Sequence, residues 1–180
     1  MKYIKTLILL VGQSCSGKDS IASLLEKDGY KILKSYTTRP KRIGEENTHI
    51  FIKPEDVYQY KNDFVAYTKI GDYEYFSTKQ QLFDSQIYII DPTGIKYLKS
   101  KIKNIKFVVI YINVDTKERF KRAKEIRKDN VKEIIKRFKA EKEQFDEFKI
   151  NAEFDYSVRN YDMKKTFRII KNIIVEEMNE

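Results

Sequence analysis

The residues best suited to chemistry form one segment near the start of the sequence, Gly12-Gln13-Ser14-Cys15-Ser16-Gly17-Lys18-Asp19. Its spacing fits the frame G-x-x-x-x-G-K, in which two glycines permit backbone conformations that turn successive N–H groups inward around a phosphate. An apolar run at residues 7–11 precedes the segment, and a helix-forming stretch begins at Ser20. The N-terminus of a helix adds positive potential, and Lys18 adds a full charge. The segment therefore predicts a phosphate-binding loop rather than a glycine-rich turn that only connects a strand to a helix.

The position after the lysine departs from the usual frame. A Ser or Thr there supplies a hydroxyl to Mg²⁺, whereas this chain has Asp19 and then Ser20. A carboxylate is also a good Mg²⁺ ligand, so the pattern still predicts a metal site at Asp19 or Ser20. It does not decide between the two.

A second segment, Ser35-Tyr36-Thr37-Thr38-Arg39-Pro40-Lys41-Arg42-Ile43-Gly44-Glu45, carries two arginines three positions apart with hydroxyls upstream. Guanidinium groups bind phosphate oxygens with two parallel hydrogen bonds, so this pair is suited to a second phosphate. Taken alone, an arginine pair is also typical of a solvated surface. Together with the upstream loop, it indicates a donor and an acceptor phosphate, which is what phosphoryl transfer between nucleotides requires.

The composition limits the class of protein. At 180 residues the chain is long enough for one domain with a proper core. No apolar run approaches the roughly 20 residues that span a membrane, and the run at 7–11 is too short for a signal peptide. The single cysteine, Cys15, excludes an internal disulfide and fits a reducing compartment. We expect a cytoplasmic protein without a membrane partner.

The net charge of +9 raises the question of nucleic-acid binding. Most of the positive residues are lysines spread along predicted helices rather than gathered in one block, and an AT-rich genome would also favour such a composition. We therefore expect no dedicated nucleic-acid binding. A basic cleft for small anionic substrates is the better use of this charge.

Strand-like and helix-like segments alternate along the chain. The expected strands are residues 3–11, 30–33, 49–52, 64–70, 74–77, 87–90, 107–112 and 156–158. The expected helices are residues 18–28, 55–61, 78–83, 92–101, 116–149 with a break at 128–130, and 163–178. This alternation predicts an α/β fold, a parallel sheet with helices on both faces. The apolar residues of the long helical stretch recur at helical spacing and are predicted to face the core: Ile134, Ile135, Phe138, Phe145 and Phe148.

The arginine segment that follows the phosphate loop resembles that of the guanylate kinase family, which are P-loop nucleoside monophosphate kinases. The resemblance continues through residues 64–78, through Asp91-Pro92-Thr93-Gly94 and through residues 155–160, and the stretch from Arg119 to Arg137 occupies the place of the family's arginine-bearing lid. It implies a P-loop NMP-kinase-like parallel sheet sandwiched by helices in one domain. The implied parts are a core (1–34, 84–115 and 138–180), an NMP-binding subdomain (35–83) and a helical lid (116–137).

Carried onto this sequence, the resemblance implies ATP-dependent phosphoryl transfer to a nucleoside monophosphate, with GMP or dGMP as acceptor. The implied residues for the ATP phosphates and Mg²⁺ are Gly12, Gln13, Ser14, Cys15, Ser16, Gly17, Lys18, Asp19 and Ser20. Those for the acceptor are Ser35, Arg39, Arg42, Glu45, His49, Tyr75, Ser77 and Asp91. The implied catalytic residues are Lys18, Arg122 or Arg127, and Arg137.

Several positions depart from the family pattern. Ala66 aligns with a glutamate that accepts hydrogen bonds from guanine, and His49 aligns with an acceptor-site tyrosine. The sequence supports two interpretations of His49 equally: a side chain that donates a hydrogen bond to phosphate, or a partly exposed strand residue. Loss of a base-recognising carboxylate changes or relaxes specificity, unless Asp63, Asp72 or Glu74 replaces it.

The alternatives are a kinase for another base and a catalytically silent, protein-binding module of the same family. Lys18 and the intact glycine frame argue against the silent module. The sequence does not decide whether the acceptor carries ribose or deoxyribose, or whether the protein is a monomer or a dimer.

Overall fold

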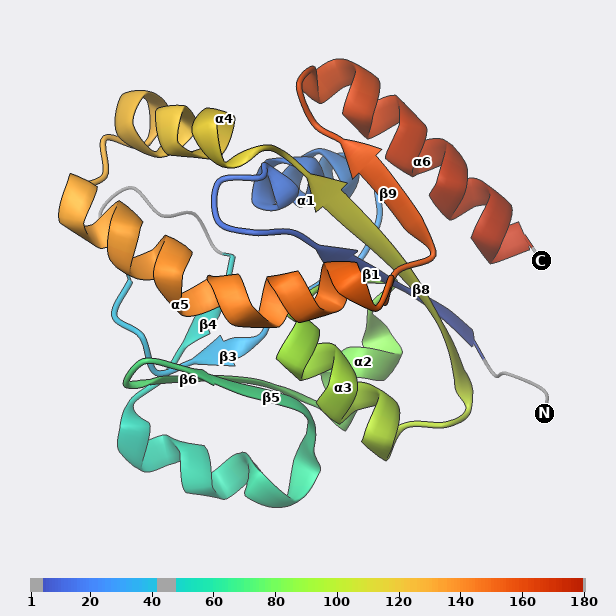
Figure 1. Ribbon diagram of the computed structural model, residues 1–180. Coiled ribbons are helices and arrows are strands. Elements are labelled where there is room, and N and C mark those ends of the chain that lie inside the picture. Colours follow the sequence, from blue (N-terminus) through green and yellow to red (C-terminus); the bar gives the residue numbers. More distant parts are fainter. Residues whose placement is uncertain (1–4, 42–47, 180) are drawn as a thin grey trace.

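The structure is a computed structural model in which residues 5–41 and 48–179 are described (Figure 1). Its main sheet has five strands in the order β2-β7-β1-β8-β9, and every neighbouring pair is parallel. The strands are β1 (Lys5–Val11), β2 (Ile32–Leu33), β7 (Ile87–Ile89), β8 (Ile105–Asn113) and β9 (Tyr156–Arg159). The predicted α/β fold with a parallel sheet is confirmed.

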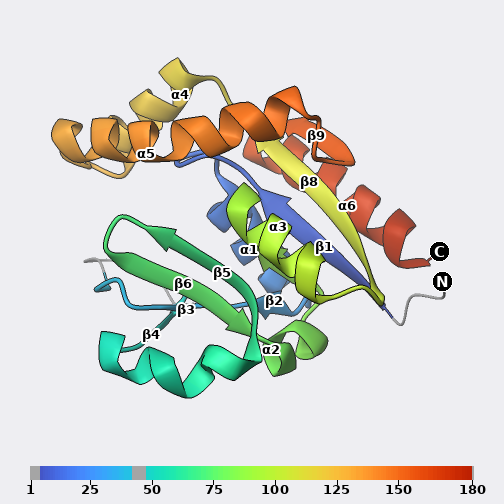
Figure 2. The same ribbon diagram turned by 60° about the horizontal axis from the view of Figure 1, so that its bottom comes forward.

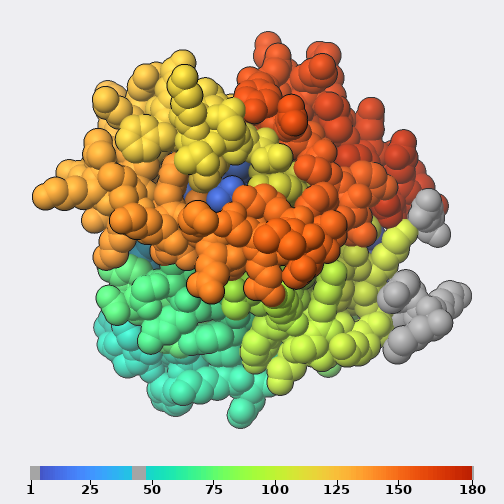
Figure 3. Space-filling model, viewed as in Figure 1, coloured from blue at the N-terminus to red at the C-terminus, as the bar shows by residue number. Residues whose placement is uncertain are grey.

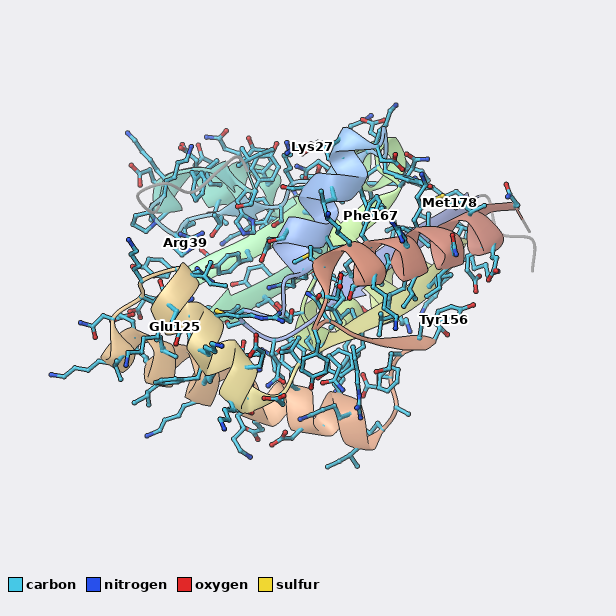
Figure 4. The ribbon with its side chains drawn as sticks, turned by 90° about the horizontal axis from the view of Figure 1, so that it is seen from above. Lys27, Arg39, Glu125, Tyr156, Phe167 and Met178 are labelled. Carbon is cyan, nitrogen blue, oxygen red and sulfur yellow. The ribbon has the colours of Figure 1, made fainter. Side chains whose placement is uncertain are left out.

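The sheet is buried on both faces, as the continuous apolar run in β1 requires. Leu7, Leu9 and Val11 belong to one hydrophobic cluster, whereas Ile8 and Leu10 belong to another on the opposite face. Two helices cover the first face: α3 (Pro92–Lys101) and α5 (Val131–Ile150). The second face is covered by α1 (Lys18–Lys27) and α6 (Met163–Asn179), which lie side by side in Figure 4 at the labels Lys27 and Phe167.

A second, smaller sheet lies below the main sheet in Figure 2. Its strands, in the order β4-β3-β6-β5, are β3 (Tyr36–Thr37), β4 (Ile50–Phe51), β5 (Phe64–Ile70) and β6 (Tyr73–Thr78). The antiparallel hairpin β5–β6 turns at Gly71, whose φ of 61° suits glycine. The short helix α2 (Lys79–Asp84) then leads back to the main sheet.

The segment Pro54–Asp63, predicted as a helix over 55–61, is a 3₁₀ helix. Val57 is its one buried residue, so tertiary packing gives little support to a regular α-helix there. Tyr60 of this helix packs with three other rings, Tyr36, Phe64 and Phe76, in one aromatic cluster.

The long helical stretch is interrupted where the sequence predicts a break. Helix α4 (Thr116–Lys121) passes into a π-helical turn at Arg122–Ile126, and α5 begins at Val131. Lys128 in the break has a φ of 55°, and the Asn130 side chain accepts the Lys132 N–H at 2.9 Å, which caps α5. The π-helical turn itself was not predicted. The prediction for Ile135 is wrong: it is 44% exposed, because it lies one residue around the helix from the fully buried Ile134.

Lys5 joins β1 to the end of α2 in a way that the sequence does not indicate. Its ammonium group, on β1, donates hydrogen bonds to the carbonyls of Leu82 at 3.1 Å and Phe83 at 3.0 Å, and also to Ser85. These carbonyls lie at the end of α2, where the negative end of the helix dipole favours a cation. None of the described helices is long and apolar enough to cross a membrane.

Candidate active site

The predicted phosphate loop lies between the end of β1 and the start of α1. Cys15 has a φ of 63° and Gly17 a φ of 90°, so two of its peptide units adopt left-handed conformations that turn amides inward. The Ser16 N–H donates to the Gln13 carbonyl at 3.0 Å and closes a turn. No side chain caps α1 at Gly17, so the first amides of this helix remain available to an anion.

Both glycines of the loop are required by close contacts. A Cβ at Gly12 would lie 2.4 Å from Ser16 Oγ and 2.9 Å from the Ile112 carbonyl oxygen. A Cβ at Gly17 would lie 2.3 Å from Nδ2 of Asn160. Asn160 is buried and donates from Nδ2 to the Ser16 carbonyl at 2.8 Å, so it holds the loop from the end of β9.

Lys18 and Asp19 form an ion pair at the first turn of α1, with Nζ 3.4 Å from Oδ2. The Asp19 side chain is about half exposed, and against some desolvation Lys18, His49 and Arg127 hold the pKa of its carboxyl below its ordinary value. Ser20 is exposed on the same turn. Within the described part of the chain there is no cluster of three His, Cys, Asp or Glu residues that would hold a metal. A metal here would therefore need oxygen ligands from a bound phosphate, which is how Mg²⁺ is commonly held beside one or two protein groups.

Four of the residues expected to bind the acceptor come together at β3, β4 and β6. The Arg39 Nε donates to the Tyr75 hydroxyl at 3.2 Å, and Ser35 Oγ lies 3.0 Å from Nδ1 of His49. The rings of His49 and Tyr75 are 5.7 Å apart, and the Arg39 guanidinium lies 5.5 Å from the centre of the Phe51 ring. Arg42 and Glu45 lie outside the described residues.

The hairpin β5–β6 presents a polar face to the same region. Ala66 is paired with Ser77, and Thr68 with Tyr75, so these four side chains share one face of the small sheet. Thr68 donates to Oδ1 of Asp91 at 3.0 Å, which places this carboxylate at the hairpin. Burial raises the pKa of Asp91, while hydrogen bonds from the Gly94 N–H and Thr68 act in the opposite direction.

Glu74 lies on the wrong face to replace a base-recognising carboxylate at Ala66, so that hypothesis is not supported. It alternates with Tyr75 along β6 and accepts the Tyr67 hydroxyl at 2.8 Å on the other face. Burial and this hydrogen bond raise the pKa of Tyr67 to about 12. Asp72 lies in the hairpin turn, and Asp63 ends the 3₁₀ helix before β5. Asp91 is the carboxylate bonded to the Ala66 face.

The three arginines expected in the lid contact the phosphate loop to different extents. Arg122 donates to the carbonyls of Ser16 at 3.5 Å and Asn160 at 2.6 Å. Arg127 Nη1 lies 3.5 Å from Cys15 Sγ, whereas Arg137 pairs with Asp129 at 2.7 Å, an acid that also lies 3.5 Å from Arg127 Nε. In Figure 3 a small area of blue, from the N-terminal part, is visible between the yellow and orange segments that carry α4 and α5.

Sequence reasoning missed two residues that contact this loop. Glu141 of α5 accepts the Ser14 N–H, and Arg119 of α4 donates to the Ser14 carbonyl. One signal was present: Glu141 lies at helical spacing between Phe138 and Phe145, so a charged residue interrupts the apolar stripe of α5. A charge at such a position needs a buried partner.

Comparison with known proteins identifies related sequences. A family model described as guanylate kinase matches residues 4–177. A guanylate kinase of Rickettsia felis is 30% identical over 184 residues, which cover 95% of this chain and 93% of that protein. A guanylate kinase of Caldanaerobacter subterraneus subsp. tengcongensis is 28% identical over 183 residues, covering 95% and 87% of the two chains. The crystal structure of guanylate kinase from Anaplasma phagocytophilum superposes with a TM-score of 0.71 at 20% identity, covering 99% of this chain and 89% of that one, which shows a shared fold.

Two of the described glycines with positive φ, Gly17 and Gly29, make a matched test of the loop geometry. Both have positive φ, 90° and 97°, but a Cβ at Gly29 would meet nothing within 4 Å. Gly29→Ala should cost about 1–2 kcal/mol of unfolding free energy from backbone strain alone. Gly17→Ala should cost more, because its Cβ also displaces Asn160. Urea unfolding of both variants measures the difference. Equal losses of unfolding free energy would mean that the Asn160 side chain moves aside without an energetic penalty.

Proposed function

This chain belongs to the guanylate kinase family, and we propose that it transfers the γ-phosphoryl group of ATP to a nucleoside monophosphate, most favourably GMP or dGMP. The products are the nucleoside diphosphate and ADP. One observation carries the proposal: the phosphate loop leaves the N-terminus of α1 without a side-chain cap beside Lys18, and Arg127 Nη1 lies 3.5 Å from Cys15 Sγ of that loop. Lys18, His49 and Arg127 each lower the pKa of Asp19, which supports a positively charged site around the loop, as transfer between two bound phosphates requires.

In this proposal the loop from Gly12 to Ser20 binds the ATP phosphates. Inward-facing amides and the N-terminus of α1 supply positive potential, and Lys18 supplies a charge to the phosphoryl group in transfer. The ionised Asp19, or the Ser20 hydroxyl, would hold Mg²⁺, which would supply charge neutralisation to the phosphates.

The acceptor would occupy the region between β3, β4 and the hairpin. Arg39, held by Tyr75, binds the monophosphate with the hydroxyl of Ser35 and the ring of His49. The base then lies over the face that carries Ala66 and Ser77. Arg42 and Glu45 complete this site in the proposal, although both lie outside the described residues.

Catalysis in this proposal needs no covalent intermediate. It needs the two phosphates in line and their charge neutralised, so Lys18 with Arg122, Arg127 and Arg137 would surround the phosphoryl group. Asp129, which pairs with Arg127 and Arg137, would hold both arginines until phosphate replaces it. We further propose that residues 35–83 and 116–137 move as an acceptor subdomain and a lid that exclude water.

A kinase for another base is the second candidate, and the face of the hairpin favours it. Ala66 is 1% exposed and offers no hydrogen bond, and Glu74 lies on the opposite face. The neighbouring hydroxyls of Thr68 and Ser77 both donate and accept hydrogen bonds, so they discriminate weakly between bases.

Steady-state ADP formation from ATP and Mg²⁺, with GMP, dGMP, AMP, CMP, UMP and dTMP tested in parallel, checks the proposed reaction. We expect turnover with GMP or dGMP to be fastest. Lys18→Ala should lower kcat by about 100-fold or more, because one preorganised charge is lost from the transferring phosphoryl group. Preference for another monophosphate would favour the second candidate. Absence of transfer to every acceptor would contradict the proposal and favour a silent binding module.

Arg39→Ala should weaken binding of the monophosphate and leave binding of ATP nearly unaffected. Loss of a hydrogen-bonded charge costs about 1.5–3 kcal/mol, so the KM for the acceptor should rise about 10- to 100-fold. The matched control is Arg159→Ala, which removes an exposed arginine from β9. Equal rises in the KM values of ATP and acceptor would contradict the assignment of Arg39.

Asp19→Asn tests the metal site. If the carboxylate binds Mg²⁺, the variant should require about tenfold more free Mg²⁺ for half-maximal rate, because the ligand loses its negative charge. Ser20→Ala is the matched variant on the same helical turn. A larger Mg²⁺ effect in Ser20→Ala would assign the metal to the hydroxyl instead.

A further inference from the structure

Two successive peptide units of the phosphate loop meet at Ser14, and each is bonded by one member of a pair of charged residues. The Ser14 N–H donates to Oε2 of Glu141 at 2.9 Å, and the Ser14 carbonyl accepts from Nη1 of Arg119 at 3.2 Å. The same Nη1 lies 2.9 Å from Oε1 of Glu141. The three residues, from the loop, α4 and α5, form a closed ring that we call the Ser14 clamp.

The Ser14 clamp is nearly removed from water. The Arg119 side chain is 3% exposed, that of Glu141 is 13% exposed, and the guanidinium lies 4.3 Å from the centre of the Phe138 ring. Within the described structure, Arg119 Nε has no hydrogen-bond partner. Burying such a pair costs desolvation energy that apolar residues would not cost, so the clamp is poorly explained by stability alone.

The clamp determines which amides of the loop face a ligand. It directs the Ser14 N–H towards α5, and the Ser16 N–H is used by Gln13. Anion binding therefore depends on the remaining amides, among them those of Cys15 and Gly17 at the two left-handed positions. The Ser14 carbonyl and the Cys15 N–H belong to one planar peptide unit, so the hydrogen bond from Arg119 to this carbonyl also fixes the direction of the Cys15 amide.

The charges of the clamp also matter to an anionic ligand. A lone carboxylate beside this loop would repel phosphate, and Arg119 neutralises it while remaining fixed by Thr116 at 3.4 Å and Ser14. The pair can therefore hold the loop without placing net charge next to the bound phosphates.

We propose that Glu141, paired with Arg119, is a positioning residue for the ATP phosphates, acting through the two peptide units that meet at Ser14. The proposal rests on the proposed ATP-dependent transfer and extends it to a residue that touches no substrate. It requires that loss of Glu141 weaken ATP binding and spare acceptor binding, because the bonds of the clamp join the phosphate loop to α4 and α5, whereas Arg39 bonds Tyr75 of the smaller sheet.

The experiment compares Glu141→Ala, Glu141→Gln and the control Asp146→Asn by direct titration with ATP and with GMP, and by steady-state kinetics. Glu141→Gln keeps the shape and an acceptor for Ser14 but loses the charge. Asp146→Asn removes an exposed ion pair from the same helix, where Lys142 Nζ lies 2.6 Å from Asp146 Oδ2, away from the loop. Thermal unfolding of each protein without ligand measures any general loss of stability.

We expect Glu141→Ala to weaken ATP binding about tenfold or more and Glu141→Gln about threefold, because a charge-assisted hydrogen bond is lost. The affinity for GMP should stay within about twofold of that of the unmodified protein. Asp146→Asn should change neither ligand. Equal weakening of ATP and GMP, or a lowered melting temperature with unchanged ATP affinity, would overturn the proposal and leave a structural role. If Glu141→Ala does not fold, unchanged ATP affinity in Glu141→Gln overturns it. Failure of the unmodified protein to bind ATP would instead refute the proposed function.

Discussion

The shape of the phosphate loop depends on hydrogen bonds that distant parts of the chain make to its backbone. Asn160 and Arg122 donate to the Ser16 carbonyl, and the Arg119–Glu141 pair bonds the N–H and the carbonyl of Ser14. Glycine loses more conformational freedom on folding than any other residue, so a loop with two glycines needs such external bonds to select one shape. The site can therefore form only after β9, α4 and α5 have packed.

Much of the fold follows from local sequence. The unbroken apolar run of β1 requires a sheet buried on both faces, and α3 begins where Pro92 follows the capping residue Asp91. The break before α5 follows from Asn130. The 3₁₀ helix and the π-helical turn could not be predicted, because the choice between hydrogen-bond spacings depends on which side chains tertiary packing buries.

The candidate site also contains some residues that the sequence predicts and others that it does not. Lys18 and Arg39 belong to contiguous motifs, so spacing alone locates them. Glu141 and Arg119 are 22 residues apart and meet Ser14 only in the folded chain, so no local pattern joins them. Glu74 shows the opposite error: it is close to Ala66 in sequence, but strand alternation places it on the other face.

If the proposed acceptor site is correct, Asp91 connects the fold to the choice of substrate. Its Oδ1 accepts the Gly94 N–H at 2.8 Å, which caps α3, and the Thr68 hydroxyl at 3.0 Å, which anchors the hairpin. Because the Asp91 carboxylate accepts both hydrogen bonds, it cannot rotate towards a bound base without losing the hydrogen bond that caps α3. A base over Ala66 would therefore meet a methyl group, hydroxyls and a carboxylate at a fixed position. Because hydroxyls both donate and accept, this face distinguishes bases by shape and by their reach to Asp91 more than by a matched set of hydrogen bonds.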